Sequence, residues 1–407
     1  MKYLFVHQNF PGQFLHLLQH LLKNPDNSVV FISEPNQNQV RGVRRAFYQT
    51  TATEQEATHP NARDYDLQAR RAAKVAETAG QLKRLGYEPD IVIGHHGWGE
   101  LLNLPDIWPN APILGYFEFY YRTNGQDVGY DTEFPVDEQR FARIRAMNVV
   151  NLLALSLEQH GQTPTHWQRT RYPLWAQPTI RVIPEGAHLD ICKPDRLAAR
   201  ADFAIGDFVV APKDRLVTYV ARNLEPYRGF HTMMRTLPRL LRERSDLKVI
   251  IVGGDEVSYG ARLAHGTWRE LLQRELAGQY DESRVLFPGQ VSYQVYVKML
   301  QRSDAHLYLS YPFVASWSLR EALACGCLVI GADVEPVAEF ITHQRNGLLV
   351  PGLDHDRIAD AVLAALADPR GTRKLRLAAR AYAERTLRME DHIARYESVV
   401  AEITGRG

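Results

Sequence analysis

The stretch LVTYVARNLEPYRGF, residues 216–230, carries the pattern that decides the fold. Its apolar start, Leu216–Val220, predicts a buried strand, and the polar turn after it leads through Gly229 into a helix. Two arginines, Arg222 and Arg228, flank this turn, and the planar guanidinium group suits phosphate oxygens. Taken alone, the turn fits a pair of solvated surface arginines at least as well. The stretch therefore predicts a strand–turn–helix unit with a candidate anion site.

The same alternation of short apolar runs and amphipathic stretches recurs along the whole chain, as in parallel sheets covered by helices. In the first half, the expected strands are Tyr3–His7, Val29–Ser33, Ile91–Gly94, Ile113–Tyr116, Leu152–Leu155 and Ile180–Ile183. In the second half, they are Leu216–Val220, Lys248–Val252, Val285–Phe287, His306–Leu309, Leu328–Gly331 and Gly347–Val350. Helices are expected at Gln13–Leu22, at Asp66–Leu85 and in the tail. This rhythm predicts an α/β protein.

Length and composition fit two globular domains. The chain has 407 residues, with 45% hydrophobic and 23% charged residues. Its 48 lysines and arginines nearly balance 47 acidic residues, which argues against a dedicated nucleic-acid binder. Three cysteines suit a reducing compartment and are expected to be small buried thiols. With neither a signal-peptide pattern nor a long apolar run, we expect a cytoplasmic protein without a membrane span.

The domain boundary is expected in the turn-rich segment from Pro184 to Pro194. We therefore expect an N-terminal Rossmann-like domain at residues 1–185 and a C-terminal one at residues 186–385. A tail helix at 386–407 could pack back toward the N-terminal domain. Because open α/β sheets bind ligands beyond the carboxyl ends of their strands, polar residues just after strands are the candidate site residues.

Two more loops follow strands in this way. In the first, Gly12 precedes a helical run, where free N–H groups and the helix dipole favour a phosphate. An ordinary strand-to-helix turn explains the same residues. In the second, the loop Val314, Ala315, Ser316 and Trp317 enters a helix that carries Glu321. This carboxylate could accept both hydroxyls of a ribose, or it could be a surface glutamate on an amphipathic helix.

Taken together, these motifs resemble the retaining glycosyltransferases of family 4. The resemblance rests on the loop from Arg222 to Gly229, the helix EALACGC at 321–327 and the segment NGLLVP at 346–351. The stretches HQNFPGQF at 7–14 and GYFEFYY at 115–121 resemble one bacterial branch of that family. The resemblance implies a GT-B fold, in which two doubly wound Rossmann-like domains face each other across a cleft.

The resemblance also implies roles for individual residues. Arg222 and Arg228 match the basic pair that holds the donor diphosphate, although the second is usually lysine. Glu321 matches the glutamate that holds the nucleotide ribose, and Gly12 matches a loop glycine near the donor phosphates. His95 is the best match for a histidine that faces the donor sugar, with His96 adjacent. A buried structural histidine remains the alternative for either.

One position departs from the family pattern. Where the family often has a glutamate that contacts sugar hydroxyls, eight residues before Glu321, this chain has Phe313. Because phenylalanine accepts no hydroxyl hydrogen bond, either the backbone amides of residues 314–317 bind the sugar or the donor differs from the common hexoses. The implied mechanism needs no metal and no other cofactor. The pairs Asp64 and Asp66, and Asp354 and Asp356, lie where helices begin and are interpreted as capping acids.

The acceptor is expected mainly on the first domain. Glu118, Tyr120 and Tyr121 follow a predicted strand, and aromatic faces stack on the C–H surfaces of sugars. A packed aromatic cluster between the domains is nearly as good an interpretation. Neighbours considered for the same wall are Trp98, Glu100 and Arg122. The basic group Arg41, Arg44 and Arg45 leaves a peripheral membrane contact open, although ordinary surface arginines explain it better.

The sequence thus predicts a metal-independent, retaining glycosyltransferase that moves a sugar from a nucleotide-sugar donor to a glycan, protein or small-molecule acceptor. Within the same fold, a nucleotide-sugar epimerase or a phosphorylase is the alternative enzyme. In a different class, a catalytically silent nucleotide-sugar-binding partner is the alternative. A dinucleotide oxidoreductase is disfavoured because the glycine fingerprint is missing.

Overall fold

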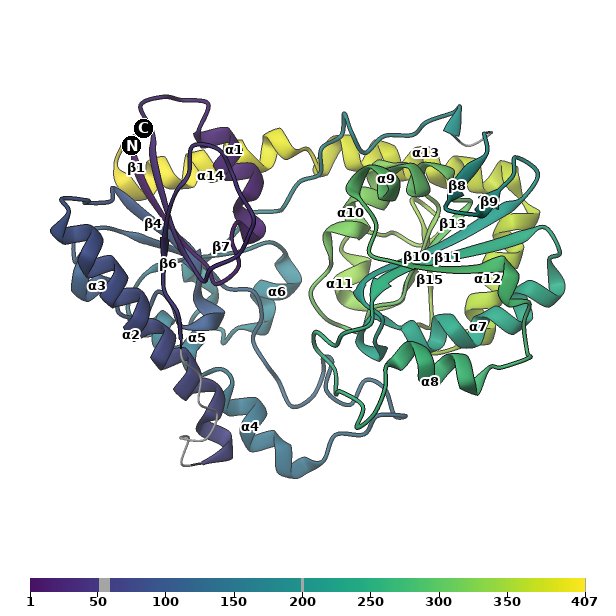
Figure 1. Cartoon of the computed structure of the whole chain (residues 1–407), viewed down its shortest axis with the longest axis horizontal. Helices are drawn as coiled ribbons and strands as arrows, with labels where there is room; N and C mark the ends of the chain where they lie inside the picture. Colours follow the sequence, from purple (N-terminus) through teal and green to yellow (C-terminus); the bar gives the residue numbers. More distant parts are fainter. Residues whose placement is uncertain (51–58, 199–200, 407) are drawn as a thin grey trace. The chain divides into compact units, whose positions relative to one another are not determined.

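The computed structural model describes residues 1–50, 59–198 and 201–406 of the chain. They form two compact units, each with a sheet covered by helices (Figure 1). Unit 1 comprises Met1–Gly129, Phe134–Pro184 and Glu390–Gly407, and unit 2 comprises Tyr130–Glu133 and Glu185–Met389. In the described part of the chain, no helix is both long and apolar enough to cross a membrane.

Unit 1 contains a seven-stranded parallel sheet. Its strands are β1 (Lys2–Val6), β2 (Ser28–Ser33), β3 (Arg44–Phe47), β4 (Ile91–His95), β5 (Ile113–Tyr116), β6 (His160–Thr163) and β7 (Ile180–Val182). Their order is β3-β2-β1-β4-β5-β6-β7, so the direction of winding reverses between β1 and β4. The carboxyl ends of β1 and β4 therefore flank the point where doubly wound sheets bind ligands.

Helices and 3₁₀ turns connect these strands. The helices of unit 1 are α1 (Leu15–Leu21), α2 (Arg63–Arg84), α3 (Leu104–Ile107), α4 (Phe141–Ala146), α5 (Val149–Ser156), α6 (His166–Arg171) and nearly all of α14 (Met389–Thr404). The 3₁₀ turns are Gly12–Phe14, Pro60–Ala62, His96–Trp98, Glu138–Arg140 and Gln177–Thr179. Tyr396 and Val400 of α14 are buried in the same core cluster as Phe5 and Phe14, so the tail helix packs on unit 1.

The two ends of the chain meet on unit 1 (Figure 1). Asp90 Oδ2 accepts a hydrogen bond from the Lys2 amide at 2.7 Å and lies 2.9 Å from the Arg406 guanidinium. These contacts lower the pKa of Asp90 against the opposing effect of its burial. One carboxylate therefore joins the first strand to the end of the tail.

Unit 2 repeats the same winding with six parallel strands and a hairpin. The sheet strands are β10 (Arg215–Asn223), β11 (Leu247–Gly254), β12 (Val285–Gly289), β13 (Ala305–Tyr308), β14 (Val329–Ala332) and β15 (Leu348–Val350), and the hairpin pairs β8 (Phe203–Ile205) with β9 (Phe208–Val210). The sheet order is β12-β11-β10-β13-β14-β15, with its reversal between β10 and β13. The predicted α/β class with two doubly wound sheets is confirmed.

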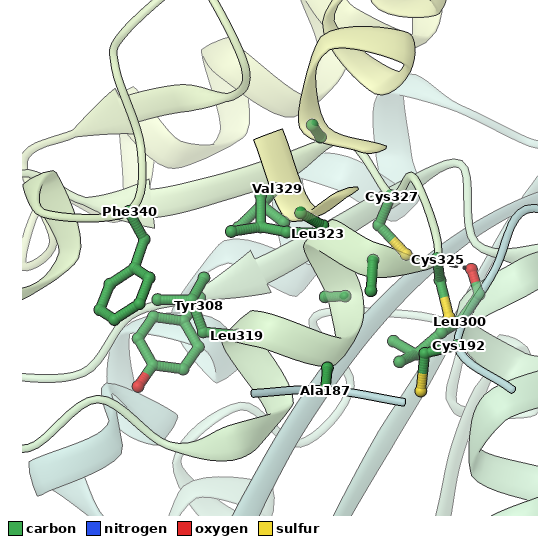
Figure 2. Close-up of a cluster of buried hydrophobic side chains, with 14 of the residues drawn as sticks. Ala187, Cys192, Leu300, Tyr308, Leu319, Leu323, Cys325, Cys327, Val329 and Phe340 are labelled. Atoms are coloured by element: carbon green, nitrogen blue, oxygen red, sulfur yellow. Dashed lines mark hydrogen bonds between the residues drawn. The ribbon is translucent and has the colours of Figure 1, made fainter. Parts of the chain in front are cut away.

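The helices of unit 2 surround this sheet. They are α7 (Phe230–Glu243), α8 (Trp268–Glu275), α9 (Tyr293–Arg302), α10 (Trp317–Ala324), α11 (Glu335–Ala338), α12 (His355–Ala367) and α13 (Pro369–Thr386), with 3₁₀ turns at Pro226–Arg228 and Glu282–Arg284. Figure 2 shows Leu319 and Leu323 of α10 beside Val329 of β14, with the three cysteines toward one end of this core. The cysteines are free and buried, as predicted.

One predicted strand is wrong. Leu152–Leu155 lies within α5, where Ala154 is buried while Leu152 and Leu153 are partly exposed. A short apolar run does not distinguish a strand from a helix by periodicity alone. The strand that the sheet uses instead is β6, His160–Thr163, which has no long apolar side chain.

Within the expected basic surface group, Arg41 and Arg44 are exposed as predicted, whereas Arg45 is partly buried. Arg44 and Arg45 lie in β3, a strand that the sequence did not predict. The Arg45 guanidinium lies 4.3 Å from the centre of the Phe10 ring and donates to the carbonyls of Asn36 and Asn38 at 3.0 Å. These contacts give Arg45 a structural role within unit 1.

Candidate functional site

The first cluster of candidate residues lies at the carboxyl edge of the unit 1 sheet. His7 directly follows β1 and His95 ends β4, so the two flank the reversal of strand order. Their ring centroids are 5.5 Å apart, and the His95 ring also lies 5.3 Å from Tyr116 and 5.8 Å from Trp98. The imidazole of His95 is therefore held at the edge where a ligand is expected.

The hydrogen bonds of His95 define its tautomer. Its Nδ1 accepts a hydrogen bond from the Gly97 amide at 2.9 Å, which leaves the neutral ring with its proton on Nε2. That Nε2 lies 3.3 Å from Oε2 of Glu118, which follows β5. The structure thus joins His95, predicted as catalytic, to Glu118, predicted on the acceptor side. Such a pair can donate a hydrogen bond to a ligand or stabilise an imidazolium.

The neighbouring histidine is a core residue. His96 is fully buried, and its ring packs on Phe117 with centroids 4.6 Å apart. Burial lowers the pKa of His96 to about 3, with a further contribution from His95. A Cβ on Gly115 would lie 2.0 Å from the His96 ring, so this position has to be glycine. Of the two adjacent histidines, only His95 reaches a polar partner in the described residues.

Gly12 lies against the other histidine of this edge. It has a φ of +56°, and a Cβ built on it would lie 3.1 Å from Nδ1 of His7. His7 is buried, and this burial lowers its pKa to about 3. The Asn9 amide donates to His7 Nδ1 at 2.9 Å, which closes the turn. The loop that carries Gly12 is thus folded around a neutral imidazole.

The stretch after β5 is held by amide side chains that the sequence analysis did not single out. Gln168 donates to the carbonyl of Glu118 at 2.6 Å, and Asn151 donates to the carbonyl of Phe119 at 3.0 Å. Asn148 bonds both the amide and the carbonyl of Tyr121 at 2.8 Å. All three are buried, so they fix this extended segment without a neighbouring strand.

The predicted aromatic wall is partly a core cluster. Tyr120 packs 5.3 Å from the buried Tyr172, and it and Tyr121 remain half-buried. Glu100, considered for the same wall, is completely buried and accepts a hydrogen bond from the Tyr48 hydroxyl. Burial raises the pKa of Glu100 to about 8. The interpretation of Glu100 as a surface wall residue is therefore wrong.

The second cluster lies at the carboxyl edge of the unit 2 sheet and depends on one glycine. Gly229, with a φ of +77°, joins the 3₁₀ turn Pro226–Arg228 to α7. A Cβ on Gly229 would lie 2.2 Å from the carbonyl oxygen of Leu309, just after β13. This close approach brings the turn after β10 against the strand on the other side of the reversal.

Arg228 and Arg222 occupy different environments. Arg228 is buried, and its Nη1 donates to Ser310 Oγ at 3.2 Å and to the Val314 carbonyl at 3.0 Å. Its guanidinium lies 5.0 Å from the centre of the Tyr259 ring. Arg222 is the residue before the last one of β10, and its exposed side chain makes no ion pair with the described residues. Arg228 therefore orders the loop after β13, and Arg222 offers an open positive charge at the same edge.

The Tyr259 ring is positioned by a buried carboxylate. Glu225, completely buried, accepts hydrogen bonds from the amides of Ser258, Tyr259 and Gly260 at 3.2, 3.2 and 2.9 Å. Tyr259 also packs on Phe313, with ring centroids 4.7 Å apart. Phe313, the departure from the family pattern, is thus part of an aromatic group around Arg228.

The loop that enters α10 is more constrained than the sequence suggested. Ala315 is buried, and the Ser316 amide donates to the Tyr308 hydroxyl at 2.8 Å. This amide was predicted to bind donor oxygens and is instead bonded within the protein. At the start of α10, the amides of Trp317 and Ser318 have no acceptor inside the helix itself, whereas the Leu319 amide donates to the Ser316 carbonyl at 3.3 Å.

Glu321 lies one turn into α10, and both of its oxygens are hydrogen-bonded. The Tyr293 hydroxyl donates to Oε1 and the Tyr296 hydroxyl to Oε2, each at 2.8 Å. Burial raises the pKa of Glu321, and the two tyrosine hydrogen bonds act in the opposite direction. The sequence identified this carboxylate but gave no sign of the two tyrosines, which lie 25 and 28 residues before it.

In the described part of the chain, one group of three residues could hold a metal ion by proximity. Ligand atoms of Asp131, Glu133 and His231 lie within 4.8 Å of one another. Glu133 is already bound by both terminal nitrogens of Arg235, at 2.5 and 2.8 Å, and the Tyr311 hydroxyl donates to Asp131. The positive charge beside these carboxylates comes from Arg235, so we interpret Asp131, Glu133, His231 and Arg235 as a network of ion pairs and hydrogen bonds.

The two aspartate pairs considered for metal binding are engaged at helix starts. Asp354 caps α12 by accepting from the amides of Asp356 and Arg357. Asp64 pairs with Arg143 at 3.1 Å and Asp66 with Arg70 at 2.9 Å, both in the first turn of α2. Asp354 is thus a capping acid as predicted, and the other pair forms ion pairs.

Comparison with known proteins identifies the family. The model for "Glycosyl transferase family 4 group" matches residues 25–192, and that for "Glycosyl transferases group 1" matches residues 204–386. The D-inositol 3-phosphate glycosyltransferase of Nocardia farcinica is 32% identical over 50% of this chain and 43% of its own length. The GDP-mannose-dependent alpha-(1-6)-phosphatidylinositol monomannoside mannosyltransferase of Mycolicibacterium smegmatis is 26% identical over 75% of each chain. The match therefore spans less than half of the first of these relatives.

Solved structures share the fold at low sequence identity. Sucrose-phosphate synthase from Thermosynechococcus elongatus superposes with a TM-score of 0.74 at 17% identity, covering 100% of both chains. HepE from Anabaena, in complex with UDP, gives a TM-score of 0.69 at 15% identity, covering 99% and 100%. The fold is that of the GT-B glycosyltransferases, as predicted. On the strength of both matching models, the chain belongs to the group 1 glycosyltransferases of family 4.

Proposed function

We propose that this protein transfers a sugar from a nucleoside-diphosphate sugar to an acceptor hydroxyl, with retention of anomeric configuration and without a metal ion. One observation carries the proposal. Arg222 lies near the end of β10 and the loop bonded by Arg228 follows β13, so both arginines lie at the edge where the strand order of unit 2 reverses. Family membership supports a nucleotide-sugar donor.

In the proposed reaction, Arg222 and the first turn of α10 stabilise the negative charge that builds on the departing diphosphate. The bond between the anomeric carbon and the β-phosphate oxygen breaks, and the bond to the acceptor oxygen forms on the same face. The β-phosphate takes the acceptor proton. His95 belongs to unit 1, and its ring is oriented by Gly97 and Glu118. Its Nε2–H group donates a hydrogen bond to the sugar that is transferred.

The donor and acceptor are proposed by class. A relative named as GDP-mannose-dependent and a structural neighbour solved in complex with UDP suggest GDP-sugars and UDP-sugars as the first donors to test. The half-buried Tyr120 and Tyr121 remain our candidates for stacking on a glycoconjugate acceptor. Glu118 is our candidate for accepting a hydrogen bond from one of its hydroxyls.

The proposal is tested by incubating the protein with UDP-glucose, UDP-N-acetylglucosamine or GDP-mannose, with and without EDTA, in the presence of sugar and inositol acceptors. Donor turnover is read by phosphorus NMR and the new linkage by proton NMR. A product with the donor's α configuration, formed at an unchanged rate in EDTA, supports the proposal. A β product would contradict retention, and loss of activity in EDTA would contradict metal independence.

A further inference from the structure

The carboxylate of Glu321 accepts hydrogen bonds from two tyrosines of another helix, α9. Tyr293 and Tyr296 are three residues apart on α9 and therefore lie on one face of it, with ring centroids 5.9 Å apart. Each hydroxyl donates to a different oxygen of Glu321 at 2.8 Å. The two rings thus approach the carboxylate together and fix the plane in which its oxygens lie.

These hydrogen bonds determine what the carboxylate can still accept. An ionised carboxylate has about four acceptor positions, two on each oxygen. The tyrosines use one position on each oxygen, so one position on each oxygen is left. A ligand with two neighbouring hydroxyls, such as the 2′ and 3′ hydroxyls of ribose, requires one acceptor on each oxygen. The two acceptor positions that remain on Glu321 therefore match the two hydroxyls of a vicinal diol.

The two tyrosines are themselves held in place. Tyr296 is buried in the core cluster of unit 2, which also contains Leu319 and Leu323 of α10. Tyr293 is half-exposed, and its hydroxyl lies 3.2 Å from Sγ of the buried Cys192. A tyrosine hydroxyl donates only one hydrogen, so with that hydrogen on Glu321 the Cys192 thiol becomes the donor to Tyr293. The rings are therefore oriented before any ligand arrives.

We propose that Tyr293 and Tyr296 are positioning residues of the nucleotide site, which orient Glu321 so that its two oxygens accept the 2′ and 3′ hydroxyls of a nucleotide ribose. The inference rests on the proposed function, because it takes Glu321 as the ribose-binding group. It adds to that group two residues on α9 that hold the Glu321 carboxylate in one orientation. The alternative is that the hydrogen bonds only fasten α9 to α10.

The test compares ribose with deoxyribose. Calorimetry measures the dissociation constants of UDP and 2′-deoxy-UDP, and of GDP and 2′-deoxy-GDP, for wild type, Tyr293→Phe, Tyr296→Phe and Glu321→Gln. Phenylalanine keeps the ring and removes only the hydroxyl. The matched control is Tyr382→Phe, which removes a hydroxyl that donates to the Glu339 carbonyl in the same unit. Thermal unfolding of every variant shows that each is folded.

Wild type is expected to prefer the ribonucleotide, and Glu321→Gln to lose this preference. Each tyrosine variant is expected to weaken ribonucleotide binding by about 5- to 10-fold, the effect of one hydrogen bond, with a smaller change for the deoxynucleotide. Retention of the wild-type preference in both variants would overturn the inference and leave the proposed function standing. No preference in wild type, with Glu321→Gln binding unchanged, would instead overturn the proposed donor site.

Discussion

In unit 1, the Nε2 atom of His95 lies 3.3 Å from Oε2 of Glu118. The two residues end or follow adjacent strands, so the register of β4 with β5 brings them together. Because Nδ1 of His95 already accepts a hydrogen bond from the Gly97 amide, Nε2 is the ring nitrogen that carries the proton and lies toward the Glu118 carboxylate.

Replacing His95 by Gln is expected to lower turnover by at least about 10-fold while the dissociation constant of the nucleoside diphosphate changes little, since the interaction is with the sugar. Steady-state kinetics and calorimetry separate the two quantities. His160→Gln, at the amino end of β6, is the matched control and should leave both unchanged. Unchanged turnover in His95→Gln would remove this imidazole from the mechanism.

Replacing Arg222 by Ala is expected to weaken nucleoside-diphosphate binding by about 10- to 100-fold, the effect of losing charge-assisted hydrogen bonds to phosphate. Because the side chain is exposed, the unfolding temperature should not change. Arg228→Lys, which keeps the charge but loses the planar fork at Ser310 and Val314, should weaken binding and also lower the unfolding temperature. Wild-type affinity in both variants would refute the donor site.

Replacing Gly229 by Ala tests the close contact between the turn after β10 and Leu309. Gly278 is the matched control, because its φ of +72° is similar and nothing lies within 4 Å of a Cβ built there. Gly278→Ala should cost about 1–2 kcal/mol from the backbone conformation alone. Gly229→Ala should cost about 1–3 kcal/mol more from the steric overlap. If chemical denaturation gave the same loss of unfolding free energy for both variants, the overlap of the new Cβ with Leu309 would not destabilise the protein.

Glu100 should make stability depend on pH. Burial raises its pKa in the folded state to about 8, above the ordinary value of 4.5, so the folded state binds the proton more tightly. Its contribution to stability is therefore full below pH 4.5 and is lost as the pH rises toward 8, at up to about 1.4 kcal/mol per pH unit. Glu100→Gln should raise the unfolding free energy relative to wild type more at pH 8 than at pH 5.

The matched control for Glu100 is Glu88→Gln, because Glu88 is exposed in the same unit. It should show the same difference from wild type at both pH values. A pH-independent difference for Glu100→Gln would mean that this carboxyl is ionised in the folded protein at neutral pH.

The strand–turn–helix units of both sheets could be predicted because their apolar runs are bounded by polar turns. β6 was missed because its sequence, His-Gly-Gln-Thr, has no apolar signal, whereas Leu152–Leu155 in α5 has one. The sheet buries β6 between β5 and β7, and this tertiary packing overrides the local pattern.

Site residues on strand ends were also predictable, because strand ends are visible in the sequence. The pairing of His95 with Glu118, and the choice between His95 and His96, depend on contacts across β4 and β5. The tyrosines that bind Glu321 lie on another helix, so only the folded chain brings them to it.

In the proposed donor site, unit 2 binds a nucleoside diphosphate through Arg222, the first turn of α10 and Glu321 without a metal. The most direct measurement is calorimetric titration of wild type and Glu321→Ala with UDP, GDP and ADP, in buffer and in buffer with EDTA. We expect wild type to bind at least one nucleotide with the same affinity with and without EDTA, and Glu321→Ala to lose this binding. Binding abolished by EDTA, or retained in full by Glu321→Ala, would contradict it.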